Sequence, residues 1–444
     1  MRMASLLLGS AVLAISTALQ AQDIAVDENT LFADSSSLAD SAAVTQGPAA
    51  SASGAEAKSL GVSGSLLCLI QGSASRDFFA SPDADSTGLY GAVVGDVVLD
   101  ARLQRGFKAY LDFEVAYLPS QADAGSDSAT SWRVPEAFLD ANIAHRAYFR
   151  FGKQVLQWGR GYFFNPTDLV NTDRNSFFRR VGNREGVFGA KVHVPFGTVW
   201  NLYGFADAQG VGRIDSVAGA FRIERLLGGT EMSAMIWDRG GGPPVYGADV
   251  STRFLGLDAT GELALHPEFT KRTLSTAGGF PSLRTETETW TPRASAGLGR
   301  SFRVSGIKDR LTTVAEYYYN GPGSRNDRMG LKALLPLLGG TSGASSSATA
   351  LAAQGLYQAN SISRNYAAFF ATFSRFMRSD ITLSFNAIGN LDQSCALLSG
   401  GIAYRDLNDF GLSLNVNGFV GPEDTEYTWS GQAAQAQLIA EAAF

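Results

Sequence analysis

Residues 432–444, QAAQAQLIAEAAF, decide the fold class of this chain. From position 434 the even positions hold alanine, leucine and the final Phe444, whereas Gln435, Gln437 and Glu441 occupy odd positions. Because successive side chains of a β-strand point to opposite faces, this pattern predicts a strand with one apolar and one polar face. An exposed phenylalanine at the end of a soluble domain would have no evident purpose. We therefore expect the apolar face of this strand to lie against lipid.

The same alternation recurs upstream, from residue 59 onward. Val93 and Val97 share one parity, and a second alternating run over 107–117 follows a turn at Arg105-Gly106. A soluble β-sandwich would also alternate, so the pattern alone does not select a membrane protein. In a membrane barrel the polar parity faces the interior. The residues that this parity places in a pore lining are Asp96, Asp100, Arg102, Lys108, Asp112, Glu114, Arg150 and Gln154.

The lengths of the connections favour the membrane barrel. Long polar connections alternate with tight turns, as in outer-membrane barrels, whose extracellular loops are long and whose periplasmic turns are short. The long connections are expected at 72–88, 119–133, 158–186, 267–287 and 320–363. The tight turns are expected near 105, 145, 196, 226, 258, 304, 378 and 407. The sequence thus predicts an all-β fold, a single transmembrane antiparallel β-barrel of about 16 to 18 strands, with 18 the preferred count.

Aromatic residues stand where several of these strands are expected to end. In outer-membrane barrels such residues form girdles at the two membrane interfaces. Aromatics also favour strands in general, which is the alternative explanation. The girdle candidates are Tyr117, Trp132, Trp237, Trp290 and the run Tyr317-Tyr318-Tyr319.

The terminal strand resembles the C-terminal signature by which the assembly machinery of bacterial outer membranes recognises its barrel proteins. The resemblance rests on the alternating apolar face and on Phe444 as its last member. It implies the barrel-assembly machinery as a partner through this strand.

The first residues indicate export. Arg2 precedes an apolar stretch over 4–19, and Leu19-Gln20-Ala21 offers a small-residue cleavage site, with Ser16-Thr17-Ala18 as an alternative. The following segment is rich in Ala, Ser and Asp and too poor in apolar residues to fold alone. The expected organisation is a signal peptide over 1–21, a disordered periplasmic tail over 22–58 and the transmembrane β-barrel over 59–444.

No later stretch reaches the roughly 18 to 20 consecutive apolar residues that a membrane helix needs. A closed barrel is then the structure that can span a bilayer, because hydrocarbon offers backbone groups no hydrogen-bond partner. The bacterial outer membrane is accordingly the expected location, with its lipid as one partner. Cys68 and Cys395 lie in expected strands, where two separate thiols or a disulfide would both be compatible with export.

Composition and motifs argue against two other classes of function. The net charge of -6 argues against a nucleic-acid partner, since phosphate binding needs clustered Lys and Arg. The sequence holds neither H-E-x-x-H nor G-x-S-x-G nor a Walker-type loop, and His145, His193 and His266 are scattered. We therefore expect neither an enzyme nor a bound cofactor or metal.

The most distinctive motif spans 150–171. It consists of Arg150-Phe-Gly-Lys-Gln154, then Gln157-Trp-Gly-Arg-Gly161, then Asn165-Pro-Thr-Asp168. It resembles a pattern of porin-like outer-membrane barrels of unknown function, in which a G-K-Q strand leads into W-G and N-P-T-D. More loosely it is similar to the family of the alginate exporter. The resemblance implies the barrel class and carries no substrate.

The connection after this strand is basic within an acidic protein. Asn165-Pro-Thr-Asp168 is turn chemistry, with an N-cap or Asx role expected for Asp168. One hypothesis is that the connection folds into the barrel and lines a constriction whose arginines favour anionic solutes. The alternative is that it packs over the rim, with its charges paired to each other or to lipid head groups. The constriction candidates are Arg160, Asp168, Arg174, Arg179 and Arg180.

These observations predict a porin-like channel for passive or facilitated diffusion of small polar solutes. The mechanism would be steric sieving with an electrostatic bias, and it needs no cofactor. The alternative is a non-conducting surface barrel that acts as a scaffold or adhesin through its extracellular loops. The sequence leaves open whether the pore is open or plugged, for example by the apolar run 331–338, and whether the chain forms a homo-oligomer.

Overall fold

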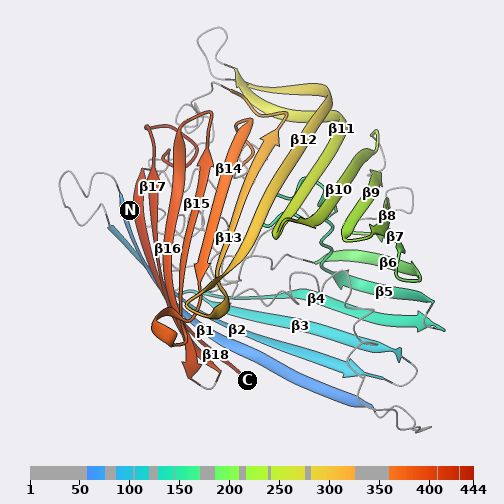
Figure 1. Cartoon of the computed structure of the whole chain (residues 1–444), viewed down its shortest axis with the longest axis horizontal. Helices are drawn as coiled ribbons and strands as arrows, with labels where there is room; N and C mark the ends of the chain where they lie inside the picture. Colours follow the sequence, from blue (N-terminus) through green and yellow to red (C-terminus); the bar gives the residue numbers. More distant parts are fainter. Residues whose placement is uncertain are drawn as a thin grey trace.

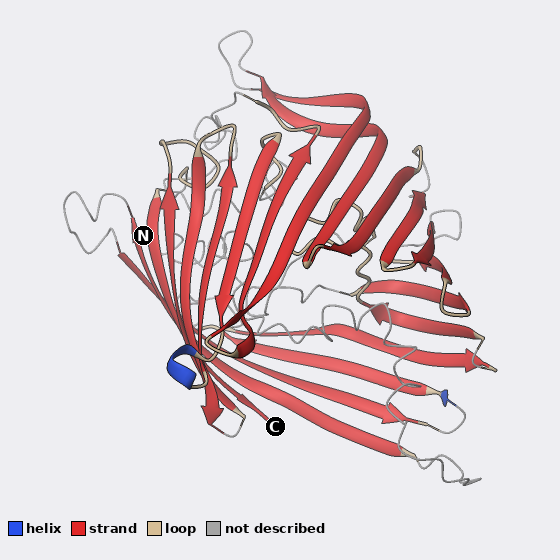
Figure 2. Ribbon diagram, viewed as in Figure 1, coloured by secondary structure: helices blue, strands red, loops and turns tan. Residues whose placement is uncertain are grey.

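The described part of the chain is almost entirely β-structure (Figures 1 and 2). The expected signal peptide, nearly all of the expected tail, His145 and the run 331–338 lie outside it. The computed structural model describes residues 58–75, 87–103, 106–119, 129–144, 146–170, 186–209, 217–238, 242–275, 282–325, 360–407, 409–429 and 431–444.

Eighteen strands form one sheet that closes on itself. Each strand pairs antiparallel with its neighbours in sequence, and β1 pairs with both β2 and β18. The strands are β1 (Ser59–Ser75), β2 (Thr87–Arg102), β3 (Lys108–Tyr117), β4 (Thr130–Ile143), β5 (Ala147–Gln154), β6 (Val187–Phe196), β7 (Trp200–Asp207), β8 (Ala218–Leu227), β9 (Thr230–Asp238), β10 (Val245–Phe254), β11 (Leu257–Ser275), β12 (Ser282–Val304), β13 (Ile307–Asn320), β14 (Asn365–Phe373), β15 (Ile381–Asn390), β16 (Cys395–Leu407), β17 (Phe410–Val420) and β18 (Gln432–Ala443). This confirms the prediction of a single all-β antiparallel barrel of about 18 strands.

The seam between the first and last strands closes the barrel. Ser65 pairs with Ala443, and the register continues along β1 and β18 to Ser75 and Gln432. The backbones of Gly64 and Phe444 extend this ladder by exchanging two hydrogen bonds of 2.9 Å each. Closure leaves the sheet without an unpaired edge at this point, which is the condition for a sheet to lie in hydrocarbon.

The two parities of the strands face different environments. Large apolar side chains are exposed on the outer face, as at Ile70 on β1, Phe151 on β5 and Phe188 on β6. The opposite face is polar or small, as at Gln71 on β1 and Arg150 on β5, both buried. An apolar exterior around a polar interior is the reverse of a soluble core and is typical of a membrane barrel.

The girdle assignment is wrong for two of the aromatic residues. Tyr117, Trp132, Trp290 and Tyr317 are exposed, as a girdle requires. Trp237 and Tyr318 are buried and pack inside the barrel. Because adjacent positions on a strand face opposite sides, three consecutive tyrosines cannot all belong to an outer girdle.

The long connection expected at 267–287 is largely a two-stranded ribbon. β11 and β12 pair with each other out to Ser275 and Ser282, whereas the pairing of β11 with β10 ends at Leu265 and that of β12 with β13 at Arg293. The ribbon bends over at the top of the view in Figure 1. The polar composition of this stretch predicts a connection, but Thr285, Thr287 and Thr289 alternate with glutamates, and threonine favours strands.

Two further features complete the fold. In the described part of the chain no helix is long and apolar enough to cross a membrane. Both cysteines are free thiols, with Cys68 exposed on the outer face and Cys395 buried.

Candidate pore constriction

The segment 155–170 leaves β5 and runs along the inside of the barrel wall. Its residues take no regular secondary structure, yet most of them are buried. The backbone N–H of Val155 donates to the Glu136 carboxylate at 2.8 Å as the chain leaves the strand. We call residues 155–170 the inner segment.

Apolar side chains fasten both ends of the inner segment to the wall. Leu156, Trp158, Leu169 and Val170 belong to one buried cluster with inward-facing residues of β7 and β9, including Trp237. A second cluster joins Phe163 and Phe164 to aromatic residues of β13 and β14, with the rings of Phe164 and Tyr318 stacked at 4.9 Å; its other aromatic members on these strands are Tyr366 and Phe370. Burying each such side chain contributes roughly 1.5–3 kcal/mol, so the segment is held firmly.

Two wall glutamates accept the backbone N–H groups of the inner segment. Glu262 on β11 accepts from Gly161 at 2.6 Å and from both the backbone and the hydroxyl of Thr167, at 3.1 and 2.7 Å. Glu316 on β13 accepts from the backbones of Phe163 and Phe164 at 2.9 and 3.0 Å, and also from Tyr162. A segment without helix or sheet partners would otherwise bury unpaired N–H groups, which is costly.

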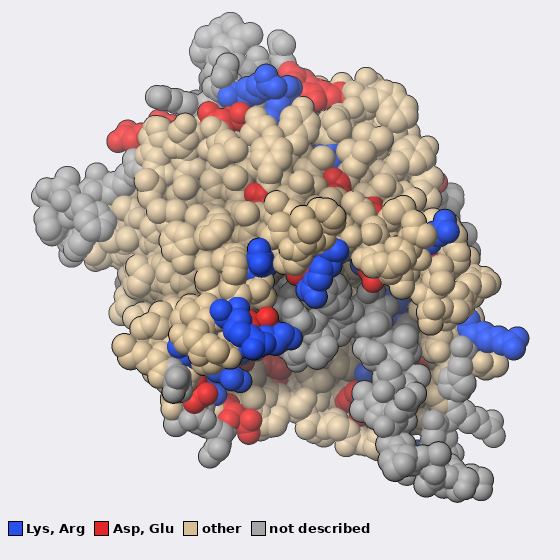
Figure 3. Space-filling view, in the orientation of Figure 1, with Lys and Arg blue, Asp and Glu red and all other residues tan. Residues whose placement is uncertain are grey.

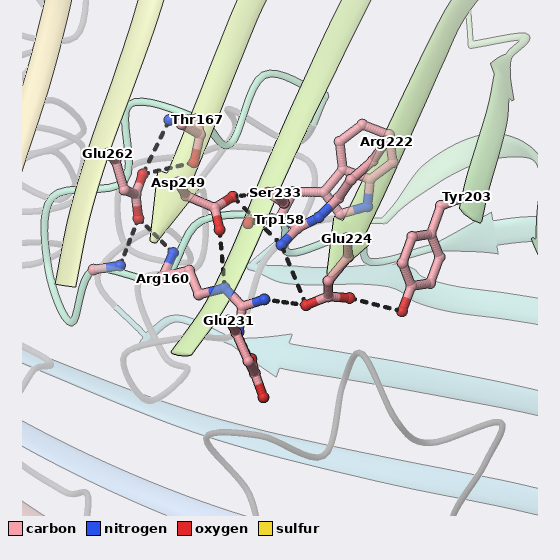
Figure 4. Close-up of polar contacts among 11 residues, drawn as sticks. Trp158, Arg160, Thr167, Tyr203, Arg222, Glu224, Glu231, Ser233, Asp249 and Glu262 are labelled. Atoms are coloured by element: carbon pink, nitrogen blue, oxygen red, sulfur yellow. Dashed lines mark hydrogen bonds and ion pairs between the residues drawn. The ribbon is translucent and has the colours of Figure 1, made fainter. Parts of the chain in front are cut away.

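Arg160 is clamped between three carboxylates on three consecutive strands (Figure 4). Its Nε lies 3.0 Å from Asp249 on β10, and its two terminal nitrogens bond Glu224 on β8 and Glu231 on β9. Its own backbone N–H donates to Glu262. With only 10% of its side chain exposed, Arg160 acts as a buried fastener of the inner segment.

Arg222 on β8 completes this cluster. It donates to the backbone carbonyl of Trp158 and lies 3.4 Å from Asp249. The guanidinium groups of Arg160 and Arg222 pair with the carboxylates of Glu224, Glu231 and Asp249. The fourth carboxylate, Glu262, accepts from the backbone N–H of Arg160. The cluster therefore carries excess negative charge, which the N–H groups of the inner segment partly offset.

The constriction candidates fall into two groups. Arg160 and Asp168 belong to the inner segment and lie inside the barrel. Asp168 is buried, and its backbone N–H closes a turn on the Asn165 carbonyl at 3.2 Å. Arg174, Arg179 and Arg180 lie outside the described residues.

The pore-lining candidates on β2 to β5 share the inner face and are cross-linked by ion pairs. Lys108 lies 3.1 Å from Asp100, and Arg133 lies 2.6 Å from Glu114. Arg150 forms a two-point pair with Asp140 at 2.7 and 2.9 Å, while its guanidinium stacks on Phe138. The other candidates are Asp96, which accepts from Ser65; Asp112 and Gln154, which are buried; and Arg102, whose side chain is 68% exposed and 3.9 Å from Asp100.

A second stretch folds inward between β17 and β18. Thr425 to Trp429 are all buried. Glu426 accepts hydrogen bonds from the Asn360 backbone at 2.7 Å, the Tyr366 hydroxyl at 2.8 Å and the Asn390 amide at 2.7 Å. Glu426 lies outside the strands, and burial raises the pKa of its carboxyl from 4.5 to about 7, against the opposing effect of these hydrogen bonds. Tyr366 and Tyr427 connect this stretch to the aromatic cluster that holds Phe163 and Phe164.

Sequence reasoning missed the residues that hold the inner segment. Glu224, Glu231, Asp249, Glu262 and Glu316 lie on β8 to β11 and β13, further along the sheet than the candidates of β2 to β5. Parity was an available signal for several of them, because Arg222 and Glu224 alternate with the outward Phe221 and Ile223. Their common partner was not foreseeable, since Arg160 is 64 residues from Glu224 and 102 from Glu262.

The described residues include no group of three or more His, Cys, Asp or Glu side chains arranged to hold a metal ion. His193 faces inward, 3.0 Å from the Asn201 side chain and stacked on Tyr203. The carboxylates of the cluster are engaged with arginines and backbone N–H groups. The geometry of this interior is therefore one of charge pairing and segment attachment.

Comparison with known proteins places the fold. No protein-family model matches the chain, and no curated protein matches it by sequence. Among solved structures it is similar to a BenF-like porin from Pseudomonas fluorescens Pf-5, with a TM-score of 0.54 and 9% identity. It is similar also to OccK2 (OpdF) of Pseudomonas aeruginosa, solved in complex with glucuronate, with a TM-score of 0.53 and 9% identity. Each match covers 87% of this chain and 98% of the other. The chain therefore shares the β-barrel fold of these porins.

Proposed function

We propose that this protein is a channel of the bacterial outer membrane through which small polar solutes diffuse, and that the inner segment narrows its lumen. The observation that carries the proposal is a stretch of chain fastened inside a closed barrel by charged and apolar contacts. A purely structural barrel needs no such internal attachment. Steric sieving by the inner segment, with a bias from the surrounding charges, would select the solutes.

The charge distribution supports polar solutes over apolar ones. The inner faces of β2 to β5 and of β8 to β13 both carry charged side chains, including the Arg150–Asp140 pair and the carboxylates around Arg160. An 18-stranded barrel is also wide enough to leave an aqueous channel beside a folded-in segment. The fold is shared with porins, one of which was solved with glucuronate, so a small carboxylate-bearing solute is a reasonable first substrate to test.

Conductance in a planar lipid bilayer tests the proposal. Purified protein should give discrete current steps, and Arg160→Ala should give larger or noisier steps because it releases the inner segment. Arg253→Gln, a change of an exposed residue at the end of β10, serves as the matched control and should leave the steps unchanged. A folded protein that gives no current steps would contradict the channel.

The protruding ribbon of β11 and β12 favours a second candidate function. Beyond His266 and Thr291 these strands pair only with each other, so they form a surface that the barrel itself does not need. A non-conducting scaffold or adhesin would use such a surface. Replacing 269–288 by a short turn should leave conductance intact if the channel is the function. Loss of surface binding in a barrel that never conducts would favour the scaffold.

We further propose that the barrel-assembly machinery recognises the strand that ends at Phe444. Supporting this, Phe444 is 69% exposed and continues the outward row of Leu438. Phe444→Ala should lower the yield of folded barrel in the outer membrane while leaving refolding in vesicles intact. An equal loss in both settings would instead indicate a role in barrel closure alone.

A further inference from the structure

Two neighbouring short turns of the barrel border an open hollow of about 540 Å³. The turn that joins β12 to β13 and the first residues of β13 contribute Gly306, Ile307, Lys308, Asp309 and Arg310. The other joins β14 to β15, contains a short 3-10 helix at Phe376–Arg378, and contributes Ser374 and Arg375. The backbone N–H of Ser374 donates to the Arg310 carbonyl at 2.8 Å and fixes the two turns relative to each other.

The hollow has unbalanced positive charge. Lys308 lies 3.4 Å from Asp309, but both side chains are well exposed, so this pair is weak. Arg310 is 7% exposed, stacks on Phe373 and donates to the Arg375 carbonyl at 2.9 Å. Among the described residues its Nε has no hydrogen-bond partner.

The two arginines of the hollow differ from those of the lumen. Arg150 and Arg160 are both paired with carboxylates. Within the described residues no carboxylate lies within ion-pair distance of Arg310 or Arg375. Arg375 is exposed, but Arg310 is buried, and burying a guanidinium without a counter-charge is costly. A site that keeps two arginines unneutralised is suited to an anion that the chain itself does not supply.

An exposed apolar side chain stands beside this charge. Met377, at the tip of the second turn, is 81% exposed. Figure 3 shows Lys and Arg side chains gathered over the part of the molecule where the turn between β12 and β13 lies in Figure 1. Basic groups next to an exposed apolar residue at the end of a membrane strand are typical of the head-group region, where phosphates and the first acyl carbons meet.

We propose that this hollow binds the phosphate group of a phospholipid in the leaflet next to the short turns. Arg375 and Arg310 would bind the phosphate oxygens, and Met377 would contact the acyl region. A free phosphate ion could form the same contacts with the arginines, but it has no acyl chain to contact Met377. The proposal rests on the proposed function only for the location of the barrel in a phospholipid-containing membrane.

Native mass spectrometry of the full-length barrel in detergent, with short-chain phosphatidylglycerol added, tests the site. Wild type should retain one lipid, and Arg375→Gln should retain about fivefold less, since one arginine near a lipid surface contributes about 1 kcal/mol. Arg253→Gln is the matched control. It removes an exposed arginine at the end of β10, where Arg253 is paired with Asp258 of β11 at 2.5 Å, and it should retain lipid like wild type.

The possible outcomes distinguish a lipid phosphate from a free phosphate, and the lipid site from the proposed channel. Equal lipid retention in Arg375→Gln and Arg253→Gln would overturn the site. An adduct formed equally well with inorganic phosphate alone would overturn the assignment to lipid. Conductance measured on the same preparations reports on the channel separately, because a barrel that does not conduct can still retain its lipid.

Discussion

At the residue scale, single positions with unusual demands shape the interior. Gly152 on β5 has φ of +128°, and a Cβ at this position would lie 2.2 Å from the Ala137 carbonyl oxygen on β4. Only glycine tolerates that combination of backbone angle and close approach. The position stands two residues before the chain leaves the strand for the inner segment, so its conformation sets where that segment starts.

Gly152→Ala should therefore destabilise the barrel by about 1–3 kcal/mol, the usual cost of one strained backbone conformation. Urea unfolding in lipid vesicles, followed by tryptophan fluorescence, measures this change. Gly219→Ala is the control, because a Cβ there meets no atom within 4 Å. Equal stability of the two variants would show that the strand adapts around position 152.

Glu426 predicts a pH dependence of stability. Burial raises the pKa of its carboxyl from 4.5 to about 7, so the folded state keeps a proton that the unfolded state loses between these values. Stability should consequently fall as the pH rises from about 4.5 to about 7, by up to about 3 kcal/mol, and stay level above. Denaturant unfolding across this range tests it. Glu426→Gln should flatten the profile, whereas Glu423→Gln, at an exposed position of the same connection, should keep it.

At the element scale, side chains of the barrel wall hold the inner segment in its conformation. It has neither helix nor sheet partners, and its N–H groups are satisfied instead by Glu262 and Glu316 from two wall strands. Such charge-assisted hydrogen bonds are stronger than neutral ones. The wall thus determines the conformation of the segment as much as the sequence of the segment does.

Glu316→Ala should loosen the centre of the inner segment. The amides of Phe163 and Phe164 lose their acceptor, and hydrogen bonds to charged groups contribute about 1.5–3 kcal/mol. Hydrogen exchange at these amides should accelerate roughly tenfold to a hundredfold. Glu286→Ala, on the exposed ribbon, should leave their exchange unchanged. Unchanged exchange in Glu316→Ala would mean that the aromatic cluster alone holds the segment.

At the scale of the whole molecule, ion pairs between inward-facing side chains determine whether the interior favours cations or anions. Arg160, the described arginine of the basic connection, lies among carboxylates from β8, β9 and β10. These carboxylates offset the positive charge of Arg160 locally, so Arg160 attracts anionic solutes only weakly. On β3 to β5 the pairs Arg150–Asp140 and Arg133–Glu114 are likewise balanced.

Arg160→Gln should shift the ion preference of the channel toward cations. The substitution leaves Glu224, Glu231 and Asp249 without one of their counter-charges, and breaking a buried ion pair typically costs about 3–5 kcal/mol. Reversal potentials in a salt gradient measure the shift, with Arg253→Gln as the control. A wild-type channel with strong anion preference, unaltered in Arg160→Gln, would contradict this account of the charge.

The sequence by itself determined the strands, their inner and outer faces and the closed barrel, because alternation is a local property that each strand displays along its own length. The sequence was less informative about strands made of polar residues, such as the ribbon of β11 and β12. Beyond the barrel these two strands pair only with each other, so they need no apolar face. Only the tertiary structure decided what the interior contains. The inner segment meets carboxylates as far as 154 residues away in sequence, from Tyr162 to Glu316. Such contacts depend on the curvature of the closed sheet, which brings opposite walls and a returning segment together and leaves no periodic signal in the chain.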